Sequence, residues 1–159
     1  MKRRMWLTSG AIVALLSVAA LRAAEPNADK PPEFKGLEYS QTGGFAGVQN
    51  TLQINAEGKV TLRQGPGPKE IKLPDGKGQL SQEDLEKLEK AVQAVDWTDV
   101  KPVYQPKRPI ADGFQYSLTV TLDDKSHRVI LHDPIDQSAP KTLLGLIKHL
   151  NELKRNAKQ

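Results

Sequence analysis

Residues 114–122 alternate strictly between apolar and polar side chains, and this alternation constrains the fold more than any other segment. The apolar positions are Phe114, Tyr116, Leu118, Val120 and Leu122. Successive side chains of a strand point to opposite faces of a sheet, so this strand has one buried face and one polar face. That pattern is typical of antiparallel sheets. It therefore predicts a sheet that is covered on one side only.

Other segments supply neighbouring strands. Residues 48–55 and 60–63 form a hairpin around the turn at 56–59, and a first strand begins near Leu37. The turn at 123–126 leads from the clearest strand back into residues 127–131. A short edge strand at 70–73 fits within the polar excursion at residues 64–78.

Two amphipathic helices complete the pattern. Ser81 is an N-cap residue ahead of a helix that ends near Asp96, with an apolar stripe at Leu85, Leu88, Val92 and Val95. Ser138 and Pro140 begin the last helix, whose inward side chains are Leu143, Ile147, Leu150 and Leu153. We therefore predict an α+β fold, with an antiparallel sheet of four to five strands and two helices packed on one face.

The N-terminus has the composition of an export signal. Basic residues at positions 2–4 precede an apolar stretch at 11–21 and small residues at 19–24. We expect residues 1–24 to be a signal peptide, cleaved between Ala20 and Glu25, and the protein to be periplasmic or secreted. An uncleaved N-terminal anchor is the alternative; after cleavage no stable membrane span is expected. Residues 25–36 are expected to be a flexible spacer, and residues 37–156 a single domain.

Charge and cysteine content exclude several classes of protein. Four of the 23 Lys and Arg residues lie in the expected leader, so the remaining chain has 19 basic and 19 acidic residues. This balance excludes a nucleic-acid-binding protein, which needs a basic surface. The absence of cysteine excludes a disulfide scaffold and thiol catalysis.

The block Thr42-Gly43-Gly44-Phe45-Ala46-Gly47 interrupts the strand pattern around it. Glycine supplies positive φ or close backbone approach, so the block predicts a shaped turn. Two interpretations of its aromatic residue remain open: Phe45 is presented to a partner, or it belongs to the core.

Residues 99–113 contain Pro102, Pro106 and Pro109 and predict a long extended loop without regular structure. Tyr104 and Arg108 are its candidate contact residues.

Recognisable catalytic and metal-binding patterns are absent from the sequence. His127 and His132 lie five residues apart near one strand and so point to opposite faces, and His149 lies on the last helix. The sequence contains no His-Glu-x-x-His, P-loop or Gly-x-Ser-x-Gly motif. We therefore expect a protein that is not an enzyme and has no cofactor and no metal site.

Gly43-Gly44-Phe45-Ala46-Gly47 and Ala111-Asp112-Gly113-Phe114-Gln115-Tyr116, with a helix between them, resemble the emfourin-like family. The resemblance runs from about residue 37 to residue 153. The family consists of small protein inhibitors of thermolysin-like zinc metalloproteases, often associated with protealysin-type enzymes. The export signal and Thr42, where the family usually has serine, depart from its pattern.

The resemblance implies an exported inhibitor whose partner is a thermolysin-like metalloprotease. The two segments able to cross a protease cleft are the glycine turn and the proline-rich loop. The candidate partner-binding residues are Gly43, Gly44, Phe45, Ala46, Gly47, Tyr104 and Arg108. The alternative function is a non-catalytic interaction module of the cell envelope.

Overall fold

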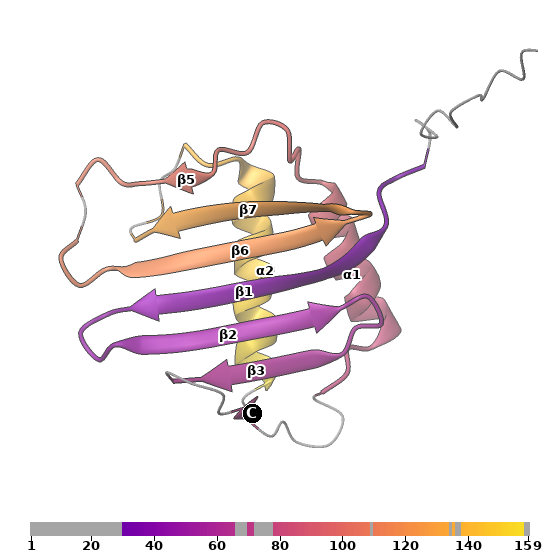
Figure 1. Ribbon diagram of the computed structural model, residues 1–159, viewed down its shortest axis with the longest axis horizontal. Helices are drawn as coiled ribbons and strands as arrows, with labels where there is room; N and C mark the ends of the chain where they lie inside the picture. The colour runs from indigo at the N-terminus through magenta and orange to yellow at the C-terminus, as the bar shows by residue number, and fades with distance from the viewer. Residues whose placement is uncertain are drawn as a thin grey trace, which may run out of the picture. The chain divides into compact units, whose positions relative to one another are not determined.

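The described part of the chain contains seven strands and two helices (Figure 1). The computed structural model describes residues 30–65, 70–71, 78–108, 110–133, 135 and 138–157. The chain divides into two units, Met1–Lys30 and Pro31–Gln159, and all of these elements lie in the second. The elements are β1 (Phe34–Gly43), β2 (Val48–Asn55), β3 (Val60–Gln64), β4 (Glu70–Ile71), α1 (Gln82–Gln93), β5 (Val103–Tyr104), β6 (Phe114–Leu122), β7 (Lys125–His132) and α2 (Lys141–Ala157).

The strands form one sheet in the order β4-β3-β2-β1-β6-β7-β5. All neighbouring pairs are antiparallel except β5 and β7, which are parallel. The α+β class is confirmed, but the expected four to five antiparallel strands become seven in a mixed sheet. The strands at the two edges, β4 and β5, have two residues each. A two-residue strand is too short to show alternation, and β5 lies inside the loop that was expected to lack regular structure.

Both helices lie behind the sheet in the view of Figure 1, so one face is covered and the other is open. In β6 the predicted alternation is confirmed over its second half: Leu118, Val120 and Leu122 are buried, whereas Ser117 and Thr119 are partly exposed. Phe114 and Tyr116, which were expected on the buried face, are only partly buried. The covered face and the helices form one hydrophobic core.

Local sequence signals account for both helices. The Ser81 side chain accepts a hydrogen bond from the Asp84 amide at 3.1 Å, which caps α1. Leu85, Leu88 and Val92 of α1 are buried as predicted. The predicted inward residues of α2 are also buried, except Leu153, which is partly buried.

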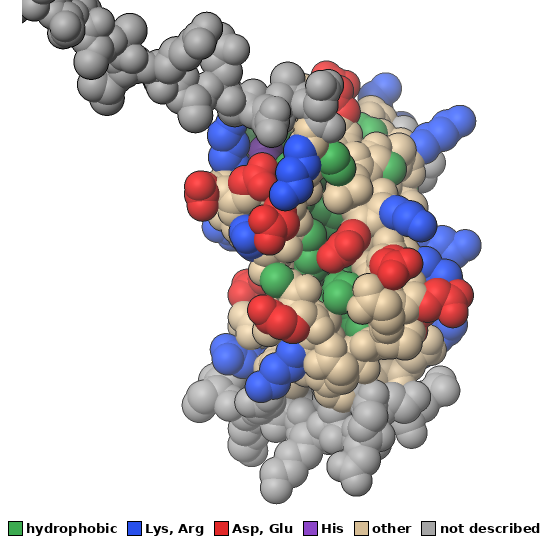
Figure 2. Space-filling model, turned by 90° about the vertical axis from the view of Figure 1, so that its right-hand side faces the viewer, with side chains coloured by type: hydrophobic (Ala, Val, Ile, Leu, Met, Phe, Trp, Pro, Cys, Tyr) green, Lys and Arg blue, Asp and Glu red, His purple; other side chains and the backbone are tan. Residues whose placement is uncertain are grey.

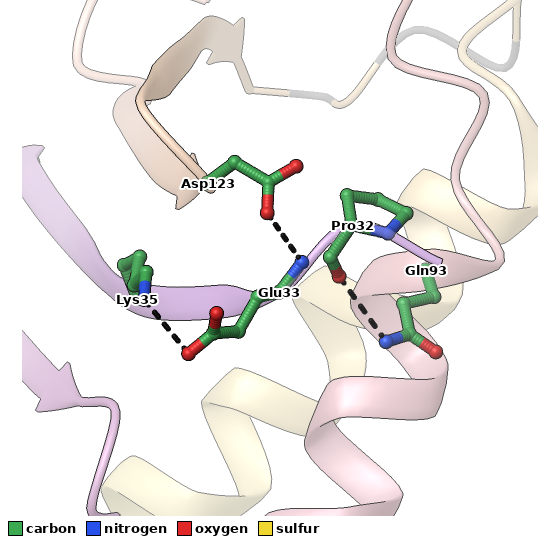
Figure 3. A network of polar contacts seen from close by, with 5 residues as sticks. All are labelled: Pro32, Glu33, Lys35, Gln93 and Asp123. Carbon is green, nitrogen blue, oxygen red and sulfur yellow. Dashed lines mark hydrogen bonds and ion pairs between the residues drawn. The ribbon is translucent and has the colours of Figure 1, made fainter. Parts of the chain in front are cut away.

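The residues just before β1, Pro32 and Glu33, are held by hydrogen bonds to other parts of the domain (Figure 3). The Glu33 amide donates to the Asp123 carboxylate at 2.9 Å, and the Asp123 amide donates to the Glu33 carbonyl oxygen at 2.8 Å. Gln93 of α1 donates to the Pro32 carbonyl oxygen at 3.4 Å. Strand β1 therefore begins at Phe34, within the last residues of the expected spacer.

The expected leader, residues 1–24, lies outside the described residues. Within the described ranges, neither helix is long and apolar enough to cross a membrane.

Candidate functional site

The two glycine-containing motifs meet at one end of the sheet. Gly43, the last residue of β1, pairs with Phe114, the first residue of β6. The turn after β1 and the loop before β6 therefore leave the sheet side by side, at its left-hand end in Figure 1. We call residues 43–47 together with residues 105–108 and 110–113 the loop pair. It contains all the predicted partner-binding residues except Tyr104.

Phe45 occupies the turn between β1 and β2. The Gly47 amide closes this turn by donating to the Gly44 carbonyl oxygen at 3.0 Å. Gly43, Gly44 and Gly47 have positive φ angles of 105°, 72° and 60°, which glycine adopts readily. The Phe45 side chain is 96% exposed, and Ala46 beside it is exposed too. Phe45 is therefore presented to solvent, and the interpretation of Phe45 as a core residue is wrong.

Close contacts explain why both motifs contain glycine. A Cβ atom at Gly43 would lie 2.7 Å from the Gly113 carbonyl oxygen, and one at Gly113 would lie 3.0 Å from the Asp133 carbonyl oxygen. A Cβ atom at Gly44 would lie 2.7 Å from the ring of Phe114. At 2.7 Å one of the two groups must move, and at 3.0 Å the neighbouring atom must move by a few tenths of an ångström. The backbones of the two segments thus touch, and the ring of Phe114 supports the turn at Gly44.

Aromatic and polar side chains fix the strands from which the loop pair extends. The ring of Tyr116 lies 6.4 Å from that of Phe114 and stacks on Tyr39 at 6.2 Å. The Tyr39 hydroxyl donates to the side-chain oxygen of Asn151 in α2 at 3.1 Å. Burial raises the pKa of Tyr39, so this hydroxyl remains a donor at neutral pH. The Lys154 ammonium group lies 5.4 Å from the centre of the Tyr39 ring. The presented turn therefore has a rigid base.

Tyr104 is not part of the exposed surface. Its side chain is 3% exposed, and its hydroxyl accepts a hydrogen bond from the Lys101 amide at 3.0 Å. It pairs with Leu131 where β5 adds to the sheet edge, and it belongs to the core. The prediction that the Tyr104 side chain is available for partner binding is therefore wrong.

The remainder of the proline-rich loop is mostly exposed. Arg108 is exposed, as a contact residue must be. Ile110 is 57% exposed and was not among the predicted contact residues. The sequence offers one signal for it: Ile110 is a large aliphatic residue that stands alone between Pro109 and the polar residues of the following turn.

The opposite end of the domain has a different surface. Figure 2 shows acidic and basic side chains distributed together around a strip of hydrophobic side chains. A hollow of about 410 Å³ at this end is lined by apolar residues, including Trp97 and Leu122, and by acidic residues, including Asp123. Among the described residues of this end, no aromatic side chain is as exposed as Phe45 in the loop pair.

Comparison with known proteins supports the predicted resemblance. Residues 76–151 match the protein family described as Emfourin. This part of the chain is similar to the Emfourin family. The matched region contains α1, β5, β6, β7, the second glycine motif and the first part of α2. None of the curated proteins matches the chain.

The emfourin match begins after the first motif, so residues 43–47 lie outside it. The structure connects them to the matched region, because Gly43 contacts Gly113 and Gly44 contacts Phe114. The presented turn is therefore packed against residues of the emfourin region.

The histidines of the matched region do not form a common site. His127 lies 5.4 Å from the ring of Trp97, measured between ring centres, and His132 lies at the end of β7 on the other face. In the ranges that the structure describes, no three His, Cys, Asp or Glu side chains are grouped so that they could hold a metal ion. The feature of the loop pair that stands out chemically is an exposed aromatic side chain on a rigid support. That feature suits contact with a protein surface.

Proposed function

We propose that this protein is an exported inhibitor of a thermolysin-like zinc metalloprotease. The observation that carries the proposal is the 96% exposure of Phe45 on a glycine turn that is fixed from below. The Emfourin family match is consistent with a role as a protease inhibitor. In this proposal the protein contributes a binding surface and performs no catalysis of its own.

The turn would act by filling the cleft of the protease. A large apolar side chain can enter the pocket beside the scissile position, and the backbone around it can pair with the walls of the cleft. Because the turn is already ordered, little conformational entropy is lost when it binds. Its rigidity also opposes the extended conformation that a good substrate adopts. Arg108, on the neighbouring loop, would contact the rim of the same cleft.

Export is a separate part of the proposal. The basic and apolar segments of residues 1–24 support it, because they match the organisation of a signal peptide. We expect processing between Ala20 and Glu25, which N-terminal sequencing of the native protein would detect. A soluble cytoplasmic protein that retains Met1 would contradict export.

Inhibition can be tested by titrating the protein against several thermolysin-like proteases with a small reporter substrate. We expect complete inhibition at a one-to-one ratio for at least one of them. Phe45→Ala should weaken inhibition about thirtyfold or more, since truncating a central interface residue costs about 2 kcal/mol or more. Glu57→Ala is the matched control, because Glu57 is exposed on the turn at the other end of β2.

The control variant should inhibit like the wild-type protein. If no protease is inhibited while another envelope protein is captured in a stable complex, the protein is an interaction module and not an inhibitor.

A further inference from the structure

Three large hydrophobic side chains are exposed in the described part of the chain, and two of them lie in the loop pair. Phe45 is 96% exposed, Ile110 is 57% exposed, and Val103, on the edge strand β5, is 40% exposed. Exposed apolar side chains that gather at one place mark interaction surfaces. We propose that Ile110 is a second apolar anchor, and that the partner has two apolar recesses, one for Phe45 and one for Ile110. This inference rests on the proposed function.

Ile110 is held in a defined position. The Gly113 amide donates to the Ile110 carbonyl oxygen at 3.1 Å, which closes a turn over residues 110–113. The Asp133 amide donates to the Phe114 carbonyl oxygen at 2.8 Å, and the Gly113 backbone lies against Asp133. The turn that carries Ile110 is therefore supported on one side by the end of β7. Such support lowers the entropy lost when the side chain is covered.

The two anchors extend from adjacent strand ends. Gly43 and Phe114 are directly paired, and the Cα atoms of paired residues in antiparallel strands are about 5 Å apart. Phe45 follows Gly43 by two residues, and Ile110 precedes Phe114 by four. One continuous partner surface can therefore cover both side chains. The contact between Gly43 and Gly113 joins the two turns, so they meet the partner as one unit.

The two recesses should differ in depth. Phe45 projects almost completely into solvent and can enter a deep pocket, whereas Ile110 is partly covered by its own domain and fits a shallow depression. A partner with a single deep pocket would use Phe45 alone. The shallow contact of Ile110 is expected beside the cleft, and the deep contact of Phe45 inside it.

The test is an inhibition titration with wild-type protein, Phe45→Ala, Ile110→Ala and the double variant. Val103→Ala is the matched control, because Val103 is also an exposed aliphatic residue but lies on the edge strand. We expect Ile110→Ala to weaken inhibition about tenfold, mainly through faster dissociation, and Val103→Ala to change it less than twofold. The melting temperature of each variant shows whether its fold is intact.

Each outcome decides between the claims. Unchanged inhibition by Ile110→Ala, together with weakened inhibition by Phe45→Ala, overturns the second anchor and leaves the proposed function in place. Absence of inhibition by the wild-type protein overturns both. Hydrogen exchange gives an independent readout: the amide of Ala111 should be more protected in the wild-type complex than in the free protein, and its unchanged exchange contradicts the second anchor.

Discussion

Phe45 and Tyr104 show how differently two similar residues can be used. Each is a lone aromatic residue in a segment rich in glycine or proline. Phe45 is presented on a turn, whereas Tyr104 completes the core at the sheet edge. Burial of such a side chain contributes roughly 1.5–3 kcal/mol to stability. Phe45 therefore forgoes a contribution that Tyr104 makes, which is expected of a side chain that binds a partner.

Truncating Tyr104 should destabilise the fold. Truncation of a buried aromatic side chain costs about 3–5 kcal/mol, so Tyr104→Ala should lower the free energy of unfolding by roughly that amount. Arg108→Ala, in the same loop, should change it by less than about 0.5 kcal/mol because Arg108 is exposed. Denaturant unfolding measures both values. Equal free energies of unfolding for the two variants would show that the Tyr104 side chain of β5 does not stabilise the core.

The second prediction concerns Tyr39 at alkaline pH. Burial raises the pKa of Tyr39 above its ordinary value of 10.0, so the fold favours the neutral hydroxyl. The resulting stability is fully present below pH 10 and is lost as the pH rises toward the raised pKa of the folded state. Relative to Tyr39→Phe, the wild-type protein should lose up to about 1.4 kcal/mol per pH unit above pH 10.

Lysines also titrate in this pH range, but they are the same in the wild-type protein and in Tyr39→Phe. Their contribution to stability therefore cancels in the difference between the two. Denaturant unfolding at several pH values gives the difference. Parallel stability curves would contradict a raised pKa at Tyr39.

At the scale of elements, the β1–β2 turn depends on a ring supplied by another strand. Gly44 and Gly47 have similar positive φ angles, of 72° and 60°, but only Gly44 is in contact with Phe114. Nothing lies within 4 Å of a Cβ atom placed at Gly47. Substituting each of the two glycines therefore distinguishes the cost of a positive φ angle, which both share, from the cost of a clash with Phe114, which only Gly44 has.

We predict that Gly44→Ala destabilises the protein and weakens inhibition more than Gly47→Ala does. Both substitutions should carry the cost of a left-handed conformation, about 1–2 kcal/mol, and Gly44→Ala should also displace the ring of Phe114. Denaturant unfolding and inhibition titration measure the two effects. Equal losses would show that Phe114 does not support the turn.

The sequence predicted elements well wherever a periodic pattern was long enough to read. Strand β6 has the predicted bounds, and α1 begins directly after the predicted cap, because alternation and capping are local properties. Strand β5 was not predicted, since its two residues carry no period and its pairing with β7 is non-local. The burial of Tyr104 depends on that pairing and was missed for the same reason. The meeting of the two glycine motifs became visible only with the strand order, which places β1 beside β6.

At the scale of the whole molecule, the length of β1 separates the place where the chain enters the sheet from the loop pair. The strand begins beside the hydrogen bonds of Pro32 and Glu33 and ends at the presented turn. Its 10 residues span roughly 30 Å, at about 3.3 Å per residue. A tether at the N-terminus would therefore join the domain far from Phe45.

The central claim is that Phe45 enters the cleft of a thermolysin-like protease, and site-specific cross-linking tests it most directly. A photoreactive phenylalanine analogue is placed at position 45 in one protein and at position 57, on the turn at the opposite end of β2, in another. We predict that position 45 cross-links to residues lining the protease cleft, that a small active-site inhibitor prevents this, and that position 57 does not cross-link. Cross-linking from position 57 alone, or from position 45 to a surface remote from the cleft, would contradict the claim.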